Sequence, residues 1–297
     1  MTAVLDRDHE AEQAAFAIER AADPQAMREM LTDRAYGAYA IAQLEERRFP
    51  LSDWYVATGP DGRRGIVVHS ASGLGRALFA EGDAAAVDAI LSLHPGPRFT
   101  FGSVRPDHFP TIERYFVALR KGHTMRMAVR AESFKPEDGE AVRFTGVDSA
   151  EVNRLYSTEG GPTAYTPSHL NEGVYYGVRI EGRLVAIAGT HVVSDAEGVA
   201  VVGNVFTHPR FRGQGHSKVA TSATTRELLQ RCPLVVLTVE TVNEPAVKVY
   251  RRLGYESVCS LHESPLIRKE PFGIISLARR GIAAWRGRTQ GKEIVLR

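Results

Sequence analysis

The sequence THPRFRGQGHS at residues 207–217 decides the expected fold, because it leads from an apolar strand into a helix. Gly213 and Gly215 let the backbone turn sharply and approach a ligand without an intervening Cβ. Successive N–H groups then face one concavity, and the start of the helix adds partial positive charge. The pattern predicts an anion site suited to a pyrophosphate. A strand-to-helix turn that binds nothing is the alternative.

Two other glycine motifs do not fit this segment. A dinucleotide-binding fingerprint would need a third glycine where the chain has Lys218. A P-loop would close with glycine, lysine and a hydroxyl residue in succession, and residues 207–217 lack that order. The loop is therefore not expected to bind its anion in either of those ways.

A second motif, NEPAVKVYRRLGY at residues 243–255, follows after one more apolar strand. Asn243 suits the N-cap of a helix and Gly254 suits the residue just past its end. Four residues have the spacing that places them on one helix face: Ala246, Val249, Tyr250 and Leu253. The segment is expected to be an amphipathic helix packed on the preceding strands.

The two motifs together resemble the GNAT superfamily of acyl-CoA-dependent N-acetyltransferases. RxxGxG at residues 210–215 resembles the pyrophosphate loop of that family, and NxxAxxxYxxxGY at residues 243–255 resembles its second signature. Tyr255 stands where phenylalanine is commoner. The resemblance covers residues 141–262 and implies an α/β fold with a central mixed sheet and two splayed strands.

The resemblance implies acetyl-CoA as the acyl-donor cosubstrate and no metal. The pantetheine arm would lie between the strands expected at 198–207 and 234–240, and would pair with backbone groups there. The implied CoA-binding residues are Val205, Thr207, Arg210, Arg212, Gly213, Gln214, Gly215, His216, Ser217, Asn243 and Tyr250. Simple helix capping explains Asn243 equally well.

The implied reaction needs an oxyanion donor, an acid and a base. A strand N–H near Val205 is the natural donor, and the resemblance gives the Tyr250 hydroxyl the role of acid toward the departing thiolate. Packing on the helix's core face is the alternative for Tyr250. The strand at 199–206 has no ionisable residue, although many family members carry a glutamate there. Glu240, His191 or a water chain would replace it as base, unless Glu240 is a solvated strand-end charge and His191 a structural histidine.

The acceptor is expected beside the segment GGPTAYTP at residues 160–167, an irregular loop rich in glycine and proline. Tyr165, Tyr175 and Tyr176 are candidates to line its pocket, or are half-buried aromatic residues. The expected acceptor is a primary amine of a small molecule or peptide, and its identity is left open. A CoA-binding regulatory or scaffold protein without turnover, and an acyltransferase for longer acyl chains, are the alternatives.

A faint internal repeat indicates two related halves. YVATGPDGR at residues 55–63 matches YYGVRIEGR at residues 175–183, and an apolar strand follows each copy. The 297 residues suit two domains. The expected division is a degenerate GNAT-like α/β domain at 1–135, a catalytic domain at 141–265 and a basic extension at 266–297.

The first half is expected to bind no CoA. EGDAA at residues 81–85 has no Gly-x-Gly, and its two carboxylates would repel a pyrophosphate at a helix start. The helix expected at 111–119 lacks the second signature as well. One CoA site per chain is predicted, in the second half.

The charge balance limits the classes of partner. There are 37 Lys and Arg residues against 35 Asp and Glu, giving a net charge of +2, which argues against bulk binding of nucleic acid or an anionic membrane. The C-terminal stretch 268–297 is nevertheless basic. It is expected to be a helix docked on the body, with an acidic-partner or nucleic-acid surface as the alternative. The oligomeric state is open.

The sequence points to the cytoplasm. Two cysteines, Cys232 and Cys259, make neither a disulfide framework nor a four-thiolate zinc site. No apolar stretch has the roughly 18 residues that a membrane-spanning helix needs. The first residues lack the basic flank and apolar core of a signal peptide.

Overall fold

A computed structural model describes residues 15–71, 75–161, 164–270 and 272–289. Residue contacts divide the chain into two compact units. The first contains the described residues up to Thr32, Glu46–His123 and those from Ser260 onward, and the second contains Asp33–Glu45 and Thr124–Cys259.

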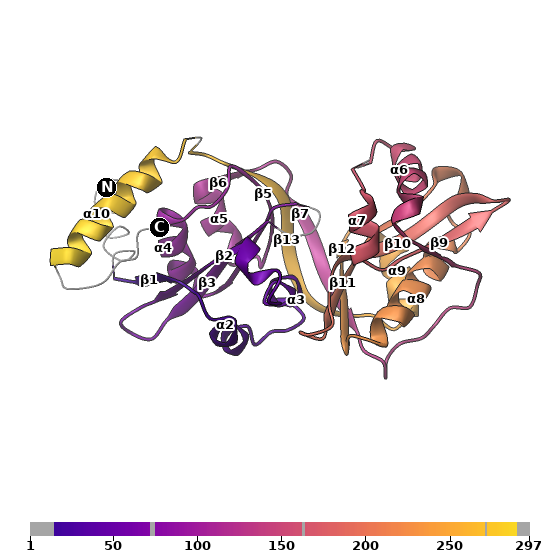
Figure 1. Ribbon diagram of the computed structural model, residues 1–297, viewed down its shortest axis with the longest axis horizontal. Coiled ribbons are helices and arrows are strands. Elements are labelled where there is room, and N and C mark those ends of the chain that lie inside the picture. The colour runs from indigo at the N-terminus through magenta and orange to yellow at the C-terminus, as the bar shows by residue number, and fades with distance from the viewer. Residues whose placement is uncertain (1–14, 72–74, 162–163, 271, 290–297) are drawn as a thin grey trace. The chain divides into compact units, whose positions relative to one another are not determined.

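The second unit is built on a mixed sheet in the order β7-β12-β11-β10-β9-β8 (Figure 1). Its β11 and β12 run parallel, and the other neighbouring pairs are antiparallel. The strands are β7 (Gly122–Val129), β8 (Val142–Phe144), β9 (Tyr175–Ile180), β10 (Arg183–Ser194), β11 (Val199–Thr207) and β12 (Leu234–Glu240). The prediction of a mixed α/β fold is confirmed.

Helices cover both faces of this sheet because side chains alternate along its strands. Ile187 of β10 packs with α6 and α7, whereas Ala186 and Ala188 face the side of α8. The longer helix α8 and the amphipathic α9 share a core with β11 and β12. The helices are α6 (Ser149–Ser157), α7 (Pro167–Glu172), α8 (His216–Leu229) and α9 (Glu244–Arg252), and the single-turn helices are η2 (Gly146–Asp148) and η3 (Pro209–Phe211). Short α3 (Ala38–Ala42) from the first half of the chain also contacts β10 and β11.

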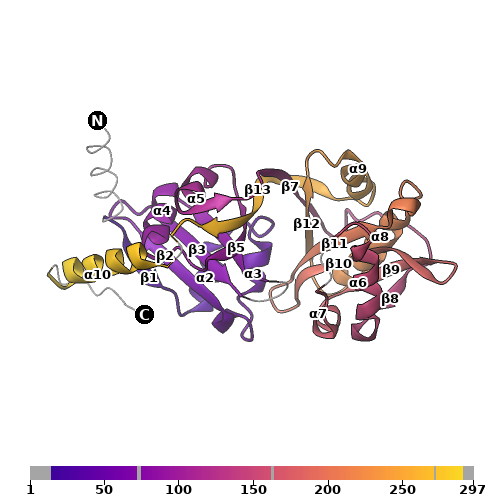
Figure 2. The same ribbon diagram turned by 90° about the horizontal axis from the view of Figure 1, so that it is seen from above.

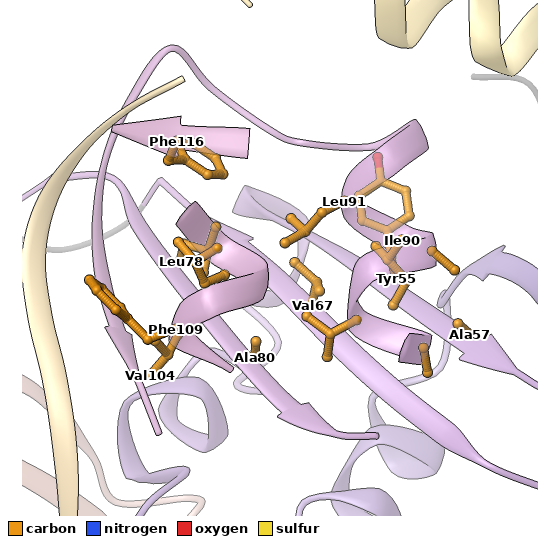
Figure 3. Close-up of a cluster of buried hydrophobic side chains, with 14 of the residues drawn as sticks. Tyr55, Ala57, Val67, Leu78, Ala80, Ile90, Leu91, Val104, Phe109 and Phe116 are labelled. Atoms are coloured by element: carbon orange, nitrogen blue, oxygen red, sulfur yellow. The ribbon is translucent and has the colours of Figure 1, made fainter. Parts of the chain in front are cut away.

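In the first unit the strands follow the order β1-β2-β3-β4-β5-β13, with β6 beside β13. Helix α4 covers it, and its Ile90 and Leu91 pack on Tyr55, Val67 and Leu78 of the strands (Figure 3). The strands are β1 (Ala17–Arg20), β2 (Ser52–Thr58), β3 (Arg64–Ser70), β4 (Ala77–Gly82), β5 (Phe99–Val104), β6 (Phe116–Ala118) and β13 (Glu256–Arg268). The helices are α2 (Pro24–Met30), η1 (Phe49–Leu51), α4 (Ala84–Leu93), α5 (Phe109–Tyr115) and α10 (Ile274–Thr289).

The last strands of the two halves are exchanged. Strand β7, which ends the first half of the chain, pairs with β12, and β13 from the second half pairs with β5. The units therefore interleave along the sequence and do not follow the expected division at 1–135, 141–265 and 266–297. Nothing in local periodicity reports such pairing, because it joins residues more than a hundred positions apart.

The expected elements agree best where the local pattern is strong. Strand β12 has the bounds expected from the sequence, and β11 begins one residue later than expected. The segment that carries α2 and α3 is divided between them by a turn, in which the Asp33 carboxylate accepts a hydrogen bond from the Tyr36 N–H. The two repeat segments are both β-hairpins, with Gly62 and Gly182 at positive φ in their turns.

Candidate functional site

The parallel strands β11 and β12 pair over only part of their length. Val199–Val202 is in register with Leu234–Leu237, and the described pairing stops there, so the ends of the two strands separate. The His208 N–H donates to the carbonyl of Val185 in β10 at 2.8 Å. In an antiparallel ladder, hydrogen-bonded and non-hydrogen-bonded residue pairs alternate. The N–H and C=O of Thr207, the residue before His208, therefore point away from β10 and toward the gap between β11 and β12. These groups lie where the sequence placed the pantetheine arm.

A β-bulge at Asn204 shapes the start of this opening. The backbone of Asn204 has φ +55°, and the register with β10 shifts between Phe206 and Gly203. The Tyr156 hydroxyl donates to the Asn204 carbonyl, and the Asn204 amide donates to the Thr190 carbonyl at 3.3 Å. The bulge leaves Val205 outside the described ladders on both sides. Sequence reasoning missed it, and an asparagine in an apolar strand was its only signal.

The loop before α8 is open at both glycines. Gly213 and Gly215 have φ +77° and +86°, and a Cβ built on either would meet nothing within 4 Å. Within the described residues, the amides of Gly213–Ser217 have no hydrogen-bond acceptor, and intrahelical bonding begins with the Lys218 N–H. Five successive free N–H groups at the start of a 14-residue helix form an anion-binding nest.

Two arginines of the loop differ in their surroundings. The Arg212 guanidinium donates to the Thr207 carbonyl at 3.2 Å and also pairs with Glu159, so it lies along the end of β11. Its amide donates to the Pro209 carbonyl at 3.4 Å, so the run of acceptor-free amides begins at Gly213. Arg210 is exposed, and its amide donates to the His208 ring.

Tyr250 lies on the core face of α9, and its hydroxyl has no hydrogen-bond partner among the described residues. Its ring is buried and makes an edge contact with Tyr255 at 6.1 Å between centroids. Desolvation raises the pKa of Tyr250 to about 12, so the hydroxyl is protonated at neutral pH. Its neighbour differs, because the Tyr255 hydroxyl is 2.7 Å from Thr225 Oγ1. Tyr250 thus packs in the core and also retains a proton to donate.

Asn243 and Glu240 lie around the turn that leads into α9. The Asn243 side chain accepts from the Ala246 N–H at 3.3 Å, so it caps the helix as the simpler interpretation expected. Glu240 ends β12 as an exposed side chain, three residues beyond the last described pairing with β11.

His191 lies directly over Gly203, the first residue of β11 beyond its pairing with β12. A Cβ built on Gly203 would be 2.0 Å from the ring Nε2, so only glycine leaves room for the imidazole. Desolvation, followed by the nearby Arg126 charge, lowers the pKa of His191 to about 4. The residue is nevertheless exposed to solvent, and the ring has no hydrogen-bond partner among the described residues. His191 is therefore a neutral imidazole at physiological pH.

Three tyrosines form a packed aromatic cluster beside the bulge. Tyr156 stacks on Tyr165 at 4.8 Å between centroids, and Tyr165 meets Tyr175 edge-on at 6.3 Å. All three are buried, so Tyr165 and Tyr175 belong to the core beneath the expected acceptor loop. Tyr176 packs with the core on the opposite face of the sheet. Residues 162–163 of the loop lie outside the described residues.

The described residues contain neither a metal-binding group nor a membrane-spanning helix. No group of three or more His, Cys, Asp or Glu side chains is arranged to hold a metal ion. None of the helices is both long and apolar enough to cross a membrane.

A mixed sheet whose parallel strands separate beside an amide-lined helix start defines the second unit as an acetyltransferase-type fold. Residues 146–255 match the family model described as Acetyltransferase (GNAT) family. The resemblance drawn from the two sequence motifs is confirmed.

Solved structures with this fold extend over more of the chain. A putative GNAT-family acetyltransferase from Novosphingobium aromaticivorans shares 24% identity, with 68% of this chain and 91% of that chain covered and a TM-score of 0.51. A GCN5-related N-acetyltransferase from Kribbella flavida has 19% identity, coverage of 80% and 96%, and a TM-score of 0.57. A tandem GNAT protein from the clavulanic acid biosynthesis pathway has 11% identity, coverage of 86% and 99%, and a TM-score of 0.52. Comparison with curated proteins gave no match.

Proposed function

We propose that the protein transfers an acetyl group from acetyl-CoA to a primary amine of a small molecule or peptide. The observation that carries this proposal is the run of five acceptor-free amides at Gly213–Ser217, beside the separated end of β11. The amides suit the pyrophosphate, and the unpaired backbone of Val205 together with the outward N–H of Thr207 suits the pantetheine arm. We place the protein in the cytoplasm, as expected from the sequence.

The chain offers a group for each step of a direct attack. The neutral amine attacks the thioester carbonyl, and the Val205 N–H would donate to the developing oxyanion. Collapse of the tetrahedral intermediate breaks the C–S bond and expels the CoA thiolate, which the Tyr250 hydroxyl would protonate. The proton lost by the amine would pass to His191, which we favour over Glu240 because its ring lies at the point where the strands separate.

Substitution of His191 tests the base. His191→Gln should lower kcat by about a hundredfold, within the usual range for general-base catalysis. In the wild type, protonation of the ring at low pH removes its acceptor, so kcat/KM should fall as the pH drops through about 4. Steady-state kinetics from pH 4 upward, with Glu240→Gln as the matched variant, measure both effects. A normal kcat in His191→Gln with a large loss in Glu240→Gln would transfer the role to Glu240.

In the first unit, a side chain of the chain itself bonds the amides at the start of α4, the helix that corresponds to α8. The Asp83 carboxylate accepts from the amides of Ala85 and Ala86 at 3.0 Å, so it takes the groups that are free at α8. His108 Nε2 lies 2.8 Å from the Gly82 carbonyl at the end of β4. These contacts support the assignment of a degenerate CoA site to this half.

Calorimetry should therefore find one acetyl-CoA per chain. The Asp83 carboxylate and its helix cap leave no nest for a second pyrophosphate, and Asp83→Asn should keep the same stoichiometry. Two equivalent sites per chain would contradict the assignment.

A screen for CoA release tests the function itself. The protein is mixed with a panel of amines and with acetyl-, propionyl- or succinyl-CoA, and free thiol is measured. Amine-dependent release is expected, fastest with acetyl-CoA. Acyl-CoA binding without release for any amine would favour a non-catalytic CoA-binding protein, an alternative that rests on the absence of a carboxylate from β11. Faster release from propionyl- or succinyl-CoA than from acetyl-CoA would favour an acyltransferase that uses longer acyl chains.

A further inference from the structure

Helix α10 is docked by its polar side. Ser276, Arg280 and Ala284 are four residues apart and therefore follow one face. Ser276 and Ala284 are buried, and Arg280 donates to the Leu93 carbonyl at the end of α4 at 2.6 Å. The Ser276 amide donates to the Glu270 carboxylate at 3.0 Å, which caps the start of the helix. Figures 1 and 2 both show α10 beside α4.

The apolar side of α10 faces solvent. Ile274, Leu277, Ile282 and Trp285 recur at the spacing of one helix face, and all four are exposed. Trp285 is 67% exposed and Leu277 is 62% exposed. Phe272, just before the helix, is exposed as well. An amphipathic helix normally buries this face, whereas here the face is exposed to solvent.

Positive charge is concentrated on the same segment. Residues 274–289 contain four arginines and no Asp or Glu, whereas the whole chain has a net charge of only +2. The Arg279 side chain is exposed. Two copies of this face would bring arginines together, which disfavours pairing with a second copy. An anionic surface complements both the arginines and the apolar stripe.

We infer that α10 is a membrane-surface helix that binds anionic phospholipid. Its isoleucines, Leu277 and Trp285 would enter the boundary between headgroups and acyl chains, while arginines at its flanks contact lipid phosphates. The whole-chain charge argued against membrane binding because it averages this helix with a net acidic remainder. The binding is peripheral and depends on lipid charge and on salt.

Vesicle flotation with the full-length protein tests the inference. Binding is expected to phosphatidylcholine–phosphatidylserine vesicles, to weaken in high salt, and to be much weaker on phosphatidylcholine alone. The double variant Ile282→Asp and Trp285→Asp should reduce the bound fraction at least about tenfold. Leu51→Asp, at an exposed leucine outside α10, should bind as the wild type does.

Charge reversal and fluorescence make the test specific to α10. Arg279→Glu should weaken binding to the anionic vesicles at least about tenfold, whereas Arg183→Glu, at an exposed residue that begins β10, should not. Trp54 is 1% exposed, so a blue shift of tryptophan emission on binding would come from Trp285. Trp285→Phe should remove the shift and retain binding.

Three results would overturn the inference. One is absence of binding to anionic vesicles, and another is binding that the double variant leaves unchanged. The third is a dimer in light scattering that the double variant dissociates, without vesicle binding, since the face would then belong to a second copy.

Discussion

Replacing Gly213 with aspartate should weaken the binding of acetyl-CoA by about thirtyfold or more while the protein remains folded. The position has φ +77°, which aspartate tolerates better than most residues, and a side chain there enters open space. Its carboxylate would repel the pyrophosphate in the amide nest. At surface-like dielectric this repulsion is worth about 2 kcal/mol or more, or about thirtyfold in affinity. Calorimetry measures the loss.

Gly213→Asn is the matched control, because it has nearly the same shape and backbone preference but no charge. Its affinity should be intermediate, and the difference between the two variants should shrink at high salt. Thermal unfolding should give both variants similar midpoints. Undiminished affinity in Gly213→Asp would remove the pyrophosphate assignment from residues 213–217.

Replacing Tyr250 with phenylalanine should lower kcat by about ten- to a thousandfold, with little change in the KM for acetyl-CoA. The hydroxyl is held protonated by burial, with its pKa raised to about 12, and it lacks a partner among the described residues. The ring packs in the α9 core, so phenylalanine keeps the fold. Steady-state and single-turnover kinetics separate chemistry from product release.

Tyr255→Phe is the matched control. It removes a hydroxyl from the same core, but that hydroxyl is bonded to Thr225 and has no proposed catalytic role. Stability should fall by about 1 kcal/mol, with kcat nearly unchanged. An unchanged kcat in Tyr250→Phe, measured where chemistry limits the rate, would make Tyr250 a packing residue only.

Local sequence signals were sufficient for much of the fold. Gly213 and Gly215 marked the turn before α8, and Asn243 and Gly254 marked the limits of α9, because their backbone or capping preferences act within a few residues. The apolar stretches gave β11 and β12. These elements carry most of the candidate CoA site.

Features set by distant partners were not predictable in the same way. The direction of Arg212 depends on Glu159, 53 positions away, and the Asn204 bulge depends on Tyr156. The exchange of β7 and β13 depends on pairing across the whole chain. Helical periodicity shows that α10 has an apolar face. It does not show which face of α10 packs against the rest of the first unit, so the exposure of the apolar face could not be predicted.

Hydrogen exchange with and without acetyl-CoA tests the central claim most directly, because it observes the amides assigned to the ligand. Acetyl-CoA should slow exchange in peptides that cover residues 203–219, including the amides of Gly213–Ser217. Peptides that cover residues 82–87 should be unaffected, because Asp83 already occupies those amides. Unchanged exchange at 203–219 under saturating acetyl-CoA, or protection at 82–87 instead, would contradict the assignment of the CoA site.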